Sequence, residues 1–268
     1  MKGGLTAANW AMATLATLAV LSAKAQTPVA LGQITPNEVP AQIQAELAAE
    51  SSRLSNGSPD WRELSLRIAR TRGPRNVQEL TLTDGSRFGL QDQQIGALIA
   101  TPLSERLTAS FSAQASPSHR VLARHGAKGN LQYEFAPAWL LHTDVGFRRY
   151  NAASVTQGSV MLEHYFSSFS AAAAWKPVRA LGVNASSAEV RAAWYYGDAS
   201  SLALVLSRGD EATAVAASRV ELADVRSLAL FGRHQISLAW SLVYGLARTR
   251  QGGFYNQNSV RLGAQYLF

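Results

Sequence analysis

Alternation of apolar and polar residues with a period of two is the feature that most constrains how this sequence can fold. Between residues 107 and 114, Leu107, Ala109, Phe111 and Ala113 alternate with polar residues without exception. Neighbouring side chains of a β-strand point to opposite faces, so the pattern predicts strands with one apolar face. The expected strands cover residues 43–54, 63–68, 79–83, 94–100, 107–114, 127–135, 139–148, 155–166, 169–175, 188–196, 202–207, 225–232, 236–247 and 260–268.

The polar positions favour a membrane barrel over the alternative, a soluble β-sandwich. Lys128, Glu134, Asp144 and Arg191 place full charges in mid-strand, whereas the apolar positions are almost free of charge. This distribution is typical of a polar lumen inside a lipid-facing wall. An open sheet in lipid would leave backbone groups unpaired, so the strands are expected to close. Trp and Tyr gather near expected strand ends, where interface girdles lie, at Trp61, Trp139, Tyr150, Trp175, Trp194, Tyr196 and Tyr266.

The first 25 residues predict an exported protein. Lys2 precedes an apolar run from Trp10 to Leu21, and residues 22–25, Ser-Ala-Lys-Ala, form a small-x-small cleavage pattern. The run is shorter than the roughly 20 apolar residues of a membrane helix. We expect residues 1–25 to be a signal peptide that is removed, 26–42 a periplasmic leader, and 43–268 the barrel. The sequence has no Cys, which excludes disulfides and a lipoprotein-type anchor.

The last nine residues are expected to form the closing strand. Val260, Leu262, Tyr266 and Phe268 share the apolar parity, and the chain ends on the aromatic residue. Outer-membrane barrels in general end in this way, and the resemblance implies an assembly signal at these four residues for the barrel-assembly machinery. We therefore expect both termini of the barrel to be periplasmic.

The number of strands follows from a parity argument. Val39, Ile43, Leu47 and Leu54 also fit a helical stripe, which would leave thirteen strands. A closed barrel with both ends in the periplasm needs an even number, which favours a first strand at residues 43–54, joined to the next by Asn56-Gly57. We predict fourteen antiparallel strands, with twelve as the alternative.

This orientation also predicts two kinds of connection. Periplasmic turns are expected to be short, at residues 101–105, 136–138, 167–168, 197–200 and 232–235. Extracellular loops are expected to be mostly longer, at residues 115–121, 150–154, 176–187, 208–224 and 249–258.

The positive charge comes almost entirely from arginine. The formal net charge is +7, and after residue 25 the only lysines are Lys128 and Lys176. Basic and aromatic residues do not interleave on one face, and the chain is expected to be exported, so nucleic acid is not an expected partner. Arginines on such a protein are expected to face the phosphates of outer-membrane lipid and lipopolysaccharide, or to pair with carboxylates inside the barrel.

Four segments resemble the YaiO-type family of outer-membrane β-barrel proteins. They are residues 54–63 (LSNGSPDWRE), 87–89 (RFG) followed by Asp92, 146–150 (GFRRY) and 195–198 (YYGD). Residues 163–168 (EHYFSS) depart from the family, in which a Tyr- and Gly-rich turn is expected. The resemblance implies a barrel in the bacterial outer membrane, in some members associated with surface polysaccharide production, and it brings no catalytic residues.

Catalytic and metal chemistry find little support in the sequence. His142, Asp144 and Arg148 share a strand face, yet no Gly-x-Ser-x-Gly motif supplies a nucleophile. The five histidines, at 119, 125, 142, 164 and 234, lie on different strands or loops and form no metal-ligand pattern. We expect no enzyme activity and no cofactor.

The inward charges therefore carry the functional hypothesis. About eight strands is the size at which side chains just fill a barrel, so fourteen leave space inside. The first hypothesis is a narrow channel for small or chain-like polar solutes, or an accessory to polysaccharide export. The alternatives are a closed structural or assembly barrel and a lipid-modifying barrel enzyme. The expected lumen residues are Glu63, Arg67, Glu79, Lys128, Glu134, His142, Asp144, Arg148, Glu189 and Arg191.

Overall fold

The computed structural model describes residues 40–151, 153–216 and 219–268, with side chains described outside 211–222. The expected signal peptide and all but the last residues of the expected leader lie outside this part of the chain. The described residues form fourteen strands and no helix. The strands are β1 (Gln42–Leu54), β2 (Trp61–Thr71), β3 (Val77–Arg87), β4 (Leu90–Pro102), β5 (Leu107–Ala115), β6 (His125–Ala136), β7 (Trp139–Arg149), β8 (Ser154–Phe166), β9 (Phe169–Ala180), β10 (Val183–Tyr196), β11 (Ser200–Ala216), β12 (Arg219–Gln235), β13 (Trp240–Gln251) and β14 (Tyr255–Leu267).

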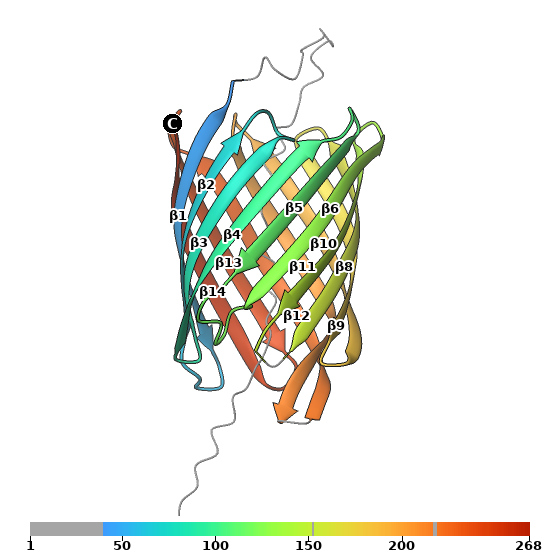
Figure 1. The fold of residues 1–268 in the computed structure, drawn as a ribbon. Helices are drawn as coiled ribbons and strands as arrows, with labels where there is room; N and C mark the ends of the chain where they lie inside the picture. The colour runs from blue at the N-terminus through green and yellow to red at the C-terminus, as the bar shows by residue number, and fades with distance from the viewer. Residues whose placement is uncertain (1–39, 152, 217–218) are drawn as a thin grey trace, which may run out of the picture.

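The strands form one closed barrel (Figure 1). Each strand pairs with its sequence neighbours in antiparallel fashion, and β1 pairs with β14, from Gln44 opposite Leu267 to Leu54 opposite Gln257. This closing pair confirms the prediction of fourteen strands over the alternative of twelve, and it confirms that residues 43–54 form a strand rather than a helix. No helix of the described residues is long and apolar enough to cross a membrane.

The two ends of the barrel differ in which connections they carry. We call the end where β1 begins and β14 ends the terminal rim, and the opposite end the distal rim (Figure 1). The terminal rim carries the connections 72–76, 103–106, 137–138, 167–168, 197–199 and 236–239. The distal rim carries 55–60, 88–89, 116–124, 181–182 and 252–254, and the β7–β8 and β11–β12 connections. That the terminal rim is periplasmic stays a prediction.

The expected contrast in loop length between the rims was wrong. The sequence favoured a long loop at 176–187, but β9 and β10 extend until only Leu181 and Gly182 separate them. The expected loop at 249–258 shrinks to residues 252–254, and most of 208–224 belongs to β11 and β12. Long strands that project beyond the apolar band replace irregular loops, so loop length does not distinguish the two rims.

One strand start was also misplaced. The alternation continues upstream of Trp240, but Ile236 and Ser237 donate their backbone N–H groups to the Trp240 carbonyl at 2.9 and 3.1 Å. These bonds close a turn, so β13 begins at Trp240 and not at Ile236.

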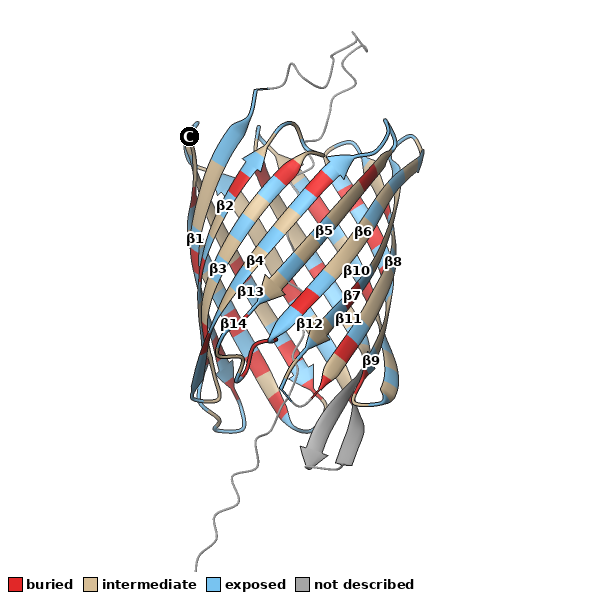
Figure 2. Cartoon of the chain, in the orientation of Figure 1, coloured by how far each residue is buried: buried red, intermediate tan, exposed pale blue. Residues whose placement is uncertain are grey.

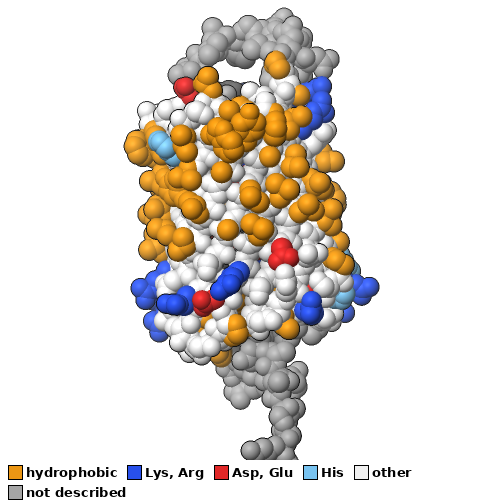
Figure 3. Space-filling view, turned by 90° about the vertical axis from the view of Figure 1, so that its left-hand side faces the viewer, with side chains coloured by type: hydrophobic (Ala, Val, Ile, Leu, Met, Phe, Trp, Pro, Cys, Tyr) orange, Lys and Arg blue, Asp and Glu red, His pale blue; other side chains and the backbone are white. Residues whose placement is uncertain are grey.

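The two faces of the wall differ in chemistry, as the alternation predicts. Large apolar side chains such as Ile99, Phe111 and Val145 are exposed on the outer face, while the inner face carries buried or half-buried small and polar residues. Figure 2 shows this change of burial from residue to residue along the strands, and Figure 3 shows the outer apolar side chains gathered in a band. The structure therefore turns its apolar surface outward, as a barrel surrounded by lipid does.

An aromatic belt lies on the outer face at the terminal rim. Consecutive ring contacts, with centroids 4.1 to 6.5 Å apart, link residues of β6 to β12, and Trp240, Tyr266 and Phe268 form a second group. Rings that are part apolar and part polar favour a membrane interface. The belt consists of Phe135, Trp139, His164, Phe166, Phe169, Trp194, Tyr196 and His234.

Trp61 does not belong to any girdle, contrary to expectation. Its side chain is inside the barrel at the distal rim, with only 4% of the residue exposed, and its ring lies edge-on to Phe88 and Tyr255. Parity explains the difference, because Trp61 shares the inner face of β2 with Glu63. Trp175, another expected girdle residue, lies on the outer face of β9 and is exposed.

Candidate functional site

The candidate site is the polar inner wall of the barrel. Each charged residue that the sequence placed in the lumen lies on the face opposite the exposed apolar side chains. These residues come from five strands, with Glu63 and Arg67 on β2, Glu79 on β3, Lys128 and Glu134 on β6, His142, Asp144 and Arg148 on β7, and Glu189 and Arg191 on β10. The register of the strands then decides which of them meet.

One ion-pair network joins the closing strands to β2 and β3. Glu46 faces Arg67 across the β1–β2 pair, and the Oε2 of Glu46 lies 2.8 Å from Nη2 of Arg67. Arg67 also donates to Glu79 at 3.1 Å. From β14, Arg261 reaches Oε1 of Glu46 at 3.3 Å and Oε2 of Glu50 at 4.0 Å. Glu46 therefore binds two guanidinium groups and links β14, β1 and β2, and the Arg67–Glu79 pair extends the network to β3.

A second series of pairs follows β6 to β10. Nζ of Lys128 lies 3.2 Å from Oδ2 of Asp144, which also accepts a hydrogen bond from Ser159. Nζ of Lys176 donates to Oε2 of Glu189 at 2.5 Å, and Arg191 lies 3.8 Å from the other oxygen of Glu189. Cations and carboxylates thus alternate around this part of the wall.

His142 pairs with a carboxylate of the neighbouring strand rather than with Asp144 on its own strand. Its Nε2 lies 3.0 Å from Oε2 of Glu163 on β8, and Asp144 pairs with Lys128 instead. His142, Asp144 and Arg148 therefore do not assemble into one catalytic group. All three line the interior of the barrel.

Most cationic side chains of the inner wall are more exposed than the carboxylates they bind, although Arg87 and Glu63 are equally exposed. The Lys128 side chain is 41% exposed and that of Asp144 11%; for Lys176 and Glu189 the values are 30% and 8%. Arg67 and Arg261 are likewise more exposed than Glu46. Long cationic side chains extend their charged ends toward water, so in these pairs the charge that reaches the lumen is mainly cationic.

The β5–β6 loop, residues 116–124, folds into the distal mouth. Oδ2 of Asp92 accepts the backbone N–H groups of Val121 and Leu122, the latter at 2.8 Å. Both residues are buried, and the Leu122 side chain faces Gly85 on the inner wall. Ser116 and Ala123 bond to Gln93 and Gln94 of β4. The loop is thereby held against β3 and β4 and narrows this entrance.

Next to this loop, an aromatic group lines the same mouth. Trp61, Phe88 and Tyr255 pack together with Leu54, and the guanidinium of Arg87 lies 5.1 Å from the centre of the Trp61 ring. Arg87 also approaches Glu63 at 3.6 Å. The cation–π contact and the ion pair hold Arg87 against the wall.

Several interior residues were missed from the sequence. Glu46, Glu163 and Arg261 sit on polar positions of expected strands, so parity alone could have found them. Lys176 was hidden by the assignment of 176–187 to a loop. The anchoring role of Asp92 depends on how a loop folds back, for which the sequence holds no signal.

Metal ligands do not cluster in the part of the chain that the structure describes. No group of three or more His, Asp or Glu side chains there could hold a metal ion. Most of the interior charges named above are instead engaged in ion pairs with one another.

These features define the class of the protein. A closed antiparallel barrel with a polar lumen, an outer apolar band and aromatic residues at one rim is a transmembrane β-barrel of the bacterial outer membrane. The sequence profile of the YaiO membrane beta barrel domain matches residues 42–211. The chain therefore belongs to the YaiO family, as the four sequence segments indicated.

Solved structures with the same fold include a channel. The CymD monoaromatic hydrocarbon channel aligns with a TM-score of 0.54 and 13% identity over 85% of this chain and 87% of its own. The outer membrane protein Omp33 of Acinetobacter baumannii aligns with a TM-score of 0.52 and 10% identity over 85% of this chain and 99% of its own. At these identities the likeness concerns the fold alone. No curated protein sequence is a detectable relative.

Proposed function

We propose that the protein is a narrow outer-membrane channel for small or chain-like polar solutes, with a preference for anions. The observation that carries the proposal is the partial exposure of paired charges on the inner wall, above all Lys128 and Lys176. If side chains filled the lumen, these ammonium groups would be buried. Their exposure is what a water-filled passage requires, and fourteen strands enclose more space than eight.

The preference for anions follows from which partner of each pair meets water. Asp144 and Glu189 lie close to the wall, whereas the lysines that bind them extend inward. A passing ion therefore meets the cationic groups first. The carboxylates behind them partly cancel the positive electrostatic field of the lysines. We expect weak rather than strict selectivity.

We assign the upper limit on solute size to the distal mouth. Asp92 holds residues 116–124 across part of this entrance, and Arg87 and Trp61 line it nearby. A constriction at one end suits a passage that admits small or extended solutes and excludes compact large ones.

A closed structural barrel is the competing function, and the extensive pairing of the interior charges favours it. Ion pairs such as Arg67–Glu46 and Arg67–Glu79 would then serve only to fix strand register. The two functions differ in one property, the passage of solutes, so transport measurements separate them.

Solute flux into proteoliposomes tests the proposal. Purified full-length mature protein is reconstituted, and swelling is recorded with a series of polar solutes of increasing size. We expect swelling that falls with solute size and is faster for anionic than for cationic solutes of equal size. Swelling no faster than in protein-free liposomes, for every solute, would leave the structural barrel as the function.

A further inference from the structure

A row of arginines crosses the outer face near the distal rim. Arg208 of β11 faces Arg226 of β12, and Arg226 in turn faces Arg250 of β13. Like charges at directly opposed positions of neighbouring strands are destabilising. A fourth arginine, Arg248, lies two residues along β13 on the same face. Strand pairing does not require arginine at these positions, so pairing alone does not explain why the fold carries this repulsion.

Nearby carboxylates compensate only part of this charge. Asp224 lies 2.9 Å from Arg226 and 3.5 Å from Arg208, and Asp210 faces Asp224 on the side away from the apolar band. Among the described residues, no carboxylate lies within ion-pair distance of Arg248 or Arg250. The side chains of Arg208 and Arg226 remain 70% and 55% exposed. The row therefore keeps an unbalanced positive charge that faces outward.

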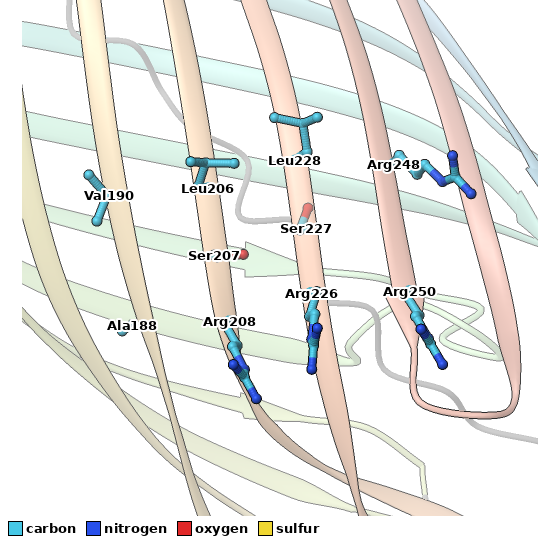
Figure 4. A pocket seen from close by; sticks show the side chains of 10 residues that line it. All are labelled: Ala188, Val190, Leu206, Ser207, Arg208, Arg226, Ser227, Leu228, Arg248 and Arg250. Carbon is cyan, nitrogen blue, oxygen red and sulfur yellow. The ribbon is translucent and has the colours of Figure 1, made fainter.

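An apolar surface borders the row directly. Leu206 faces Leu228 in the next cross-strand row, and Val190 faces Leu206 from β10. These residues and the arginines line one open depression of about 500 Å³. Figure 4 shows Arg208, Arg226 and Arg250 extending side by side away from Leu206 and Leu228. Figure 3 shows Lys and Arg side chains between the apolar band and the distal rim on the face that it draws.

We propose that Arg208, Arg226, Arg248 and Arg250 bind the phosphate groups of lipid A, the membrane anchor of lipopolysaccharide, with its acyl chains lying on Val190, Leu206 and Leu228. Guanidinium groups bind phosphate oxygens through paired, charge-assisted hydrogen bonds, and several converge here within one row. The apolar floor next to them matches a ligand whose phosphates adjoin acyl chains. Lipid A combines these two chemistries in the outer leaflet, which the distal rim meets if the terminal rim is periplasmic. This site is on the outer wall and does not depend on the proposed channel.

Lipid binding to the purified, folded barrel in detergent tests the site. Native mass spectrometry measures the binding of diphosphoryl lipid A, dephosphorylated lipid A and phosphatidylglycerol, and inorganic phosphate is added as a competitor. The test variant is R208Q/R226Q/R250Q. The matched control, R70Q/R72Q/R106Q, removes the same charge from exposed arginines at the terminal rim. Heat-modifiable gel mobility verifies folding, and the single variant R250Q is used if the triple variant does not fold.

We expect the triple variant to bind diphosphoryl lipid A at least about tenfold more weakly than the wild type, since it loses several charge-assisted bonds. The control should bind as the wild type does, and dephosphorylated lipid A should bind weakly to all three proteins. Wild-type affinity in the triple variant, or in R250Q where that variant replaces it, would overturn the proposal. So would phosphatidylglycerol binding as tightly as lipid A, which would indicate a general phospholipid site, or full competition by inorganic phosphate, which would indicate a free-anion site.

Discussion

Ser52 and Ser259, separated by 207 positions in the sequence, lie with their hydroxyl oxygens 2.7 Å apart inside the barrel. Ser52 belongs to β1 and Ser259 to β14, so this contact marks the seam where the barrel closes. Gln265 donates to Gln44 at 2.7 Å and Arg261 reaches Glu46 along the same seam. The first and last strands are thus joined by side chains as well as by backbone hydrogen bonds.

The seam predicts that Gly263→Ala destabilises the barrel. A Cβ at Gly263 would lie 2.6 Å from the Cβ of Ala48 and 2.6 Å from the Leu47 carbonyl oxygen, so the seam would have to widen. Overpacking of this kind costs about 1–3 kcal/mol. The free energy of unfolding in urea, followed by the heat-modifiable shift on gels, measures the effect. Gly129→Ala is the control, because its added Cβ meets nothing within 4 Å, and equal effects in both variants would contradict the assignment.

Glu46→Gln should weaken the network on the inner wall. The variant leaves Arg67 with Glu79, and it leaves Arg261 with the distant carboxylate of Glu50 and a 3.3 Å hydrogen bond to Ser65. Because both arginines are partly exposed, screening by water limits the loss to about 1 kcal/mol. We also expect a stronger preference for anions, since one carboxylate is removed. Glu134→Gln serves as the control, since Glu134 has no ion pair among the described residues and accepts only a 3.4 Å hydrogen bond from Ala138. A loss of unfolding free energy no larger in Glu46→Gln than in the control would contradict the assigned role of the network.

Asp92→Ala should widen the distal mouth. The variant removes the acceptor of the Val121 and Leu122 N–H groups, so residues 116–124 lose their anchor on β4. The size limit for solute flux into proteoliposomes should therefore rise. Asp84→Ala removes a carboxylate that bonds to Gln91 and Gln93 on the outer face, and it should leave the limit unchanged. An unchanged limit in Asp92→Ala would show that the loop does not set it.

The arginine row predicts an effect on stability that changes sign with the lipid. Arg250 faces Arg226, and among the described residues its one side-chain hydrogen bond is to the Gly252 carbonyl at 3.4 Å, so Arg250→Gln relieves repulsion in lipid-free detergent. We expect a gain in unfolding free energy of about 0.2–1 kcal/mol there, and a loss when lipid A is present. Arg70→Gln is the control. Arg70 faces the uncharged Ile43 and Gln78, so this variant should change the unfolding free energy neither without nor with lipid A. A loss of stability under both conditions would show that Arg250 is purely structural.

The sequence predicts the barrel well because one physical rule, the two-residue period, acts on every strand. It even identifies β1, where Ile43 and Leu47 fit a helix equally well, through the requirement that the barrel close. Strand ends follow weaker rules. Pro177 favours a loop, yet it lies within β9. Its nitrogen carries no N–H to donate, and the β8–β9 pairing is interrupted there, between Gln157–Val178 and Val160–Trp175.

Parity also predicts which charges face inward, but not which of them meet. The Glu46–Arg67 pair depends on the register between β1 and β2, and the His142–Glu163 pair on that between β7 and β8. Register follows from the geometry of each turn, which the sequence does not specify at single-residue precision. Residues 116–124 fold inward because of tertiary contacts with Asp92, and no local sequence pattern predicts this position.

Single-channel recording in a planar lipid bilayer tests the central claim most directly. With the wild-type protein under a KCl gradient, we predict discrete openings and a reversal potential displaced toward that of chloride, because Lys128 and Lys176 present the more exposed charges in the lumen. Absence of openings at every voltage and salt concentration would contradict a channel, and a reversal potential displaced toward that of potassium would contradict a cationic lumen.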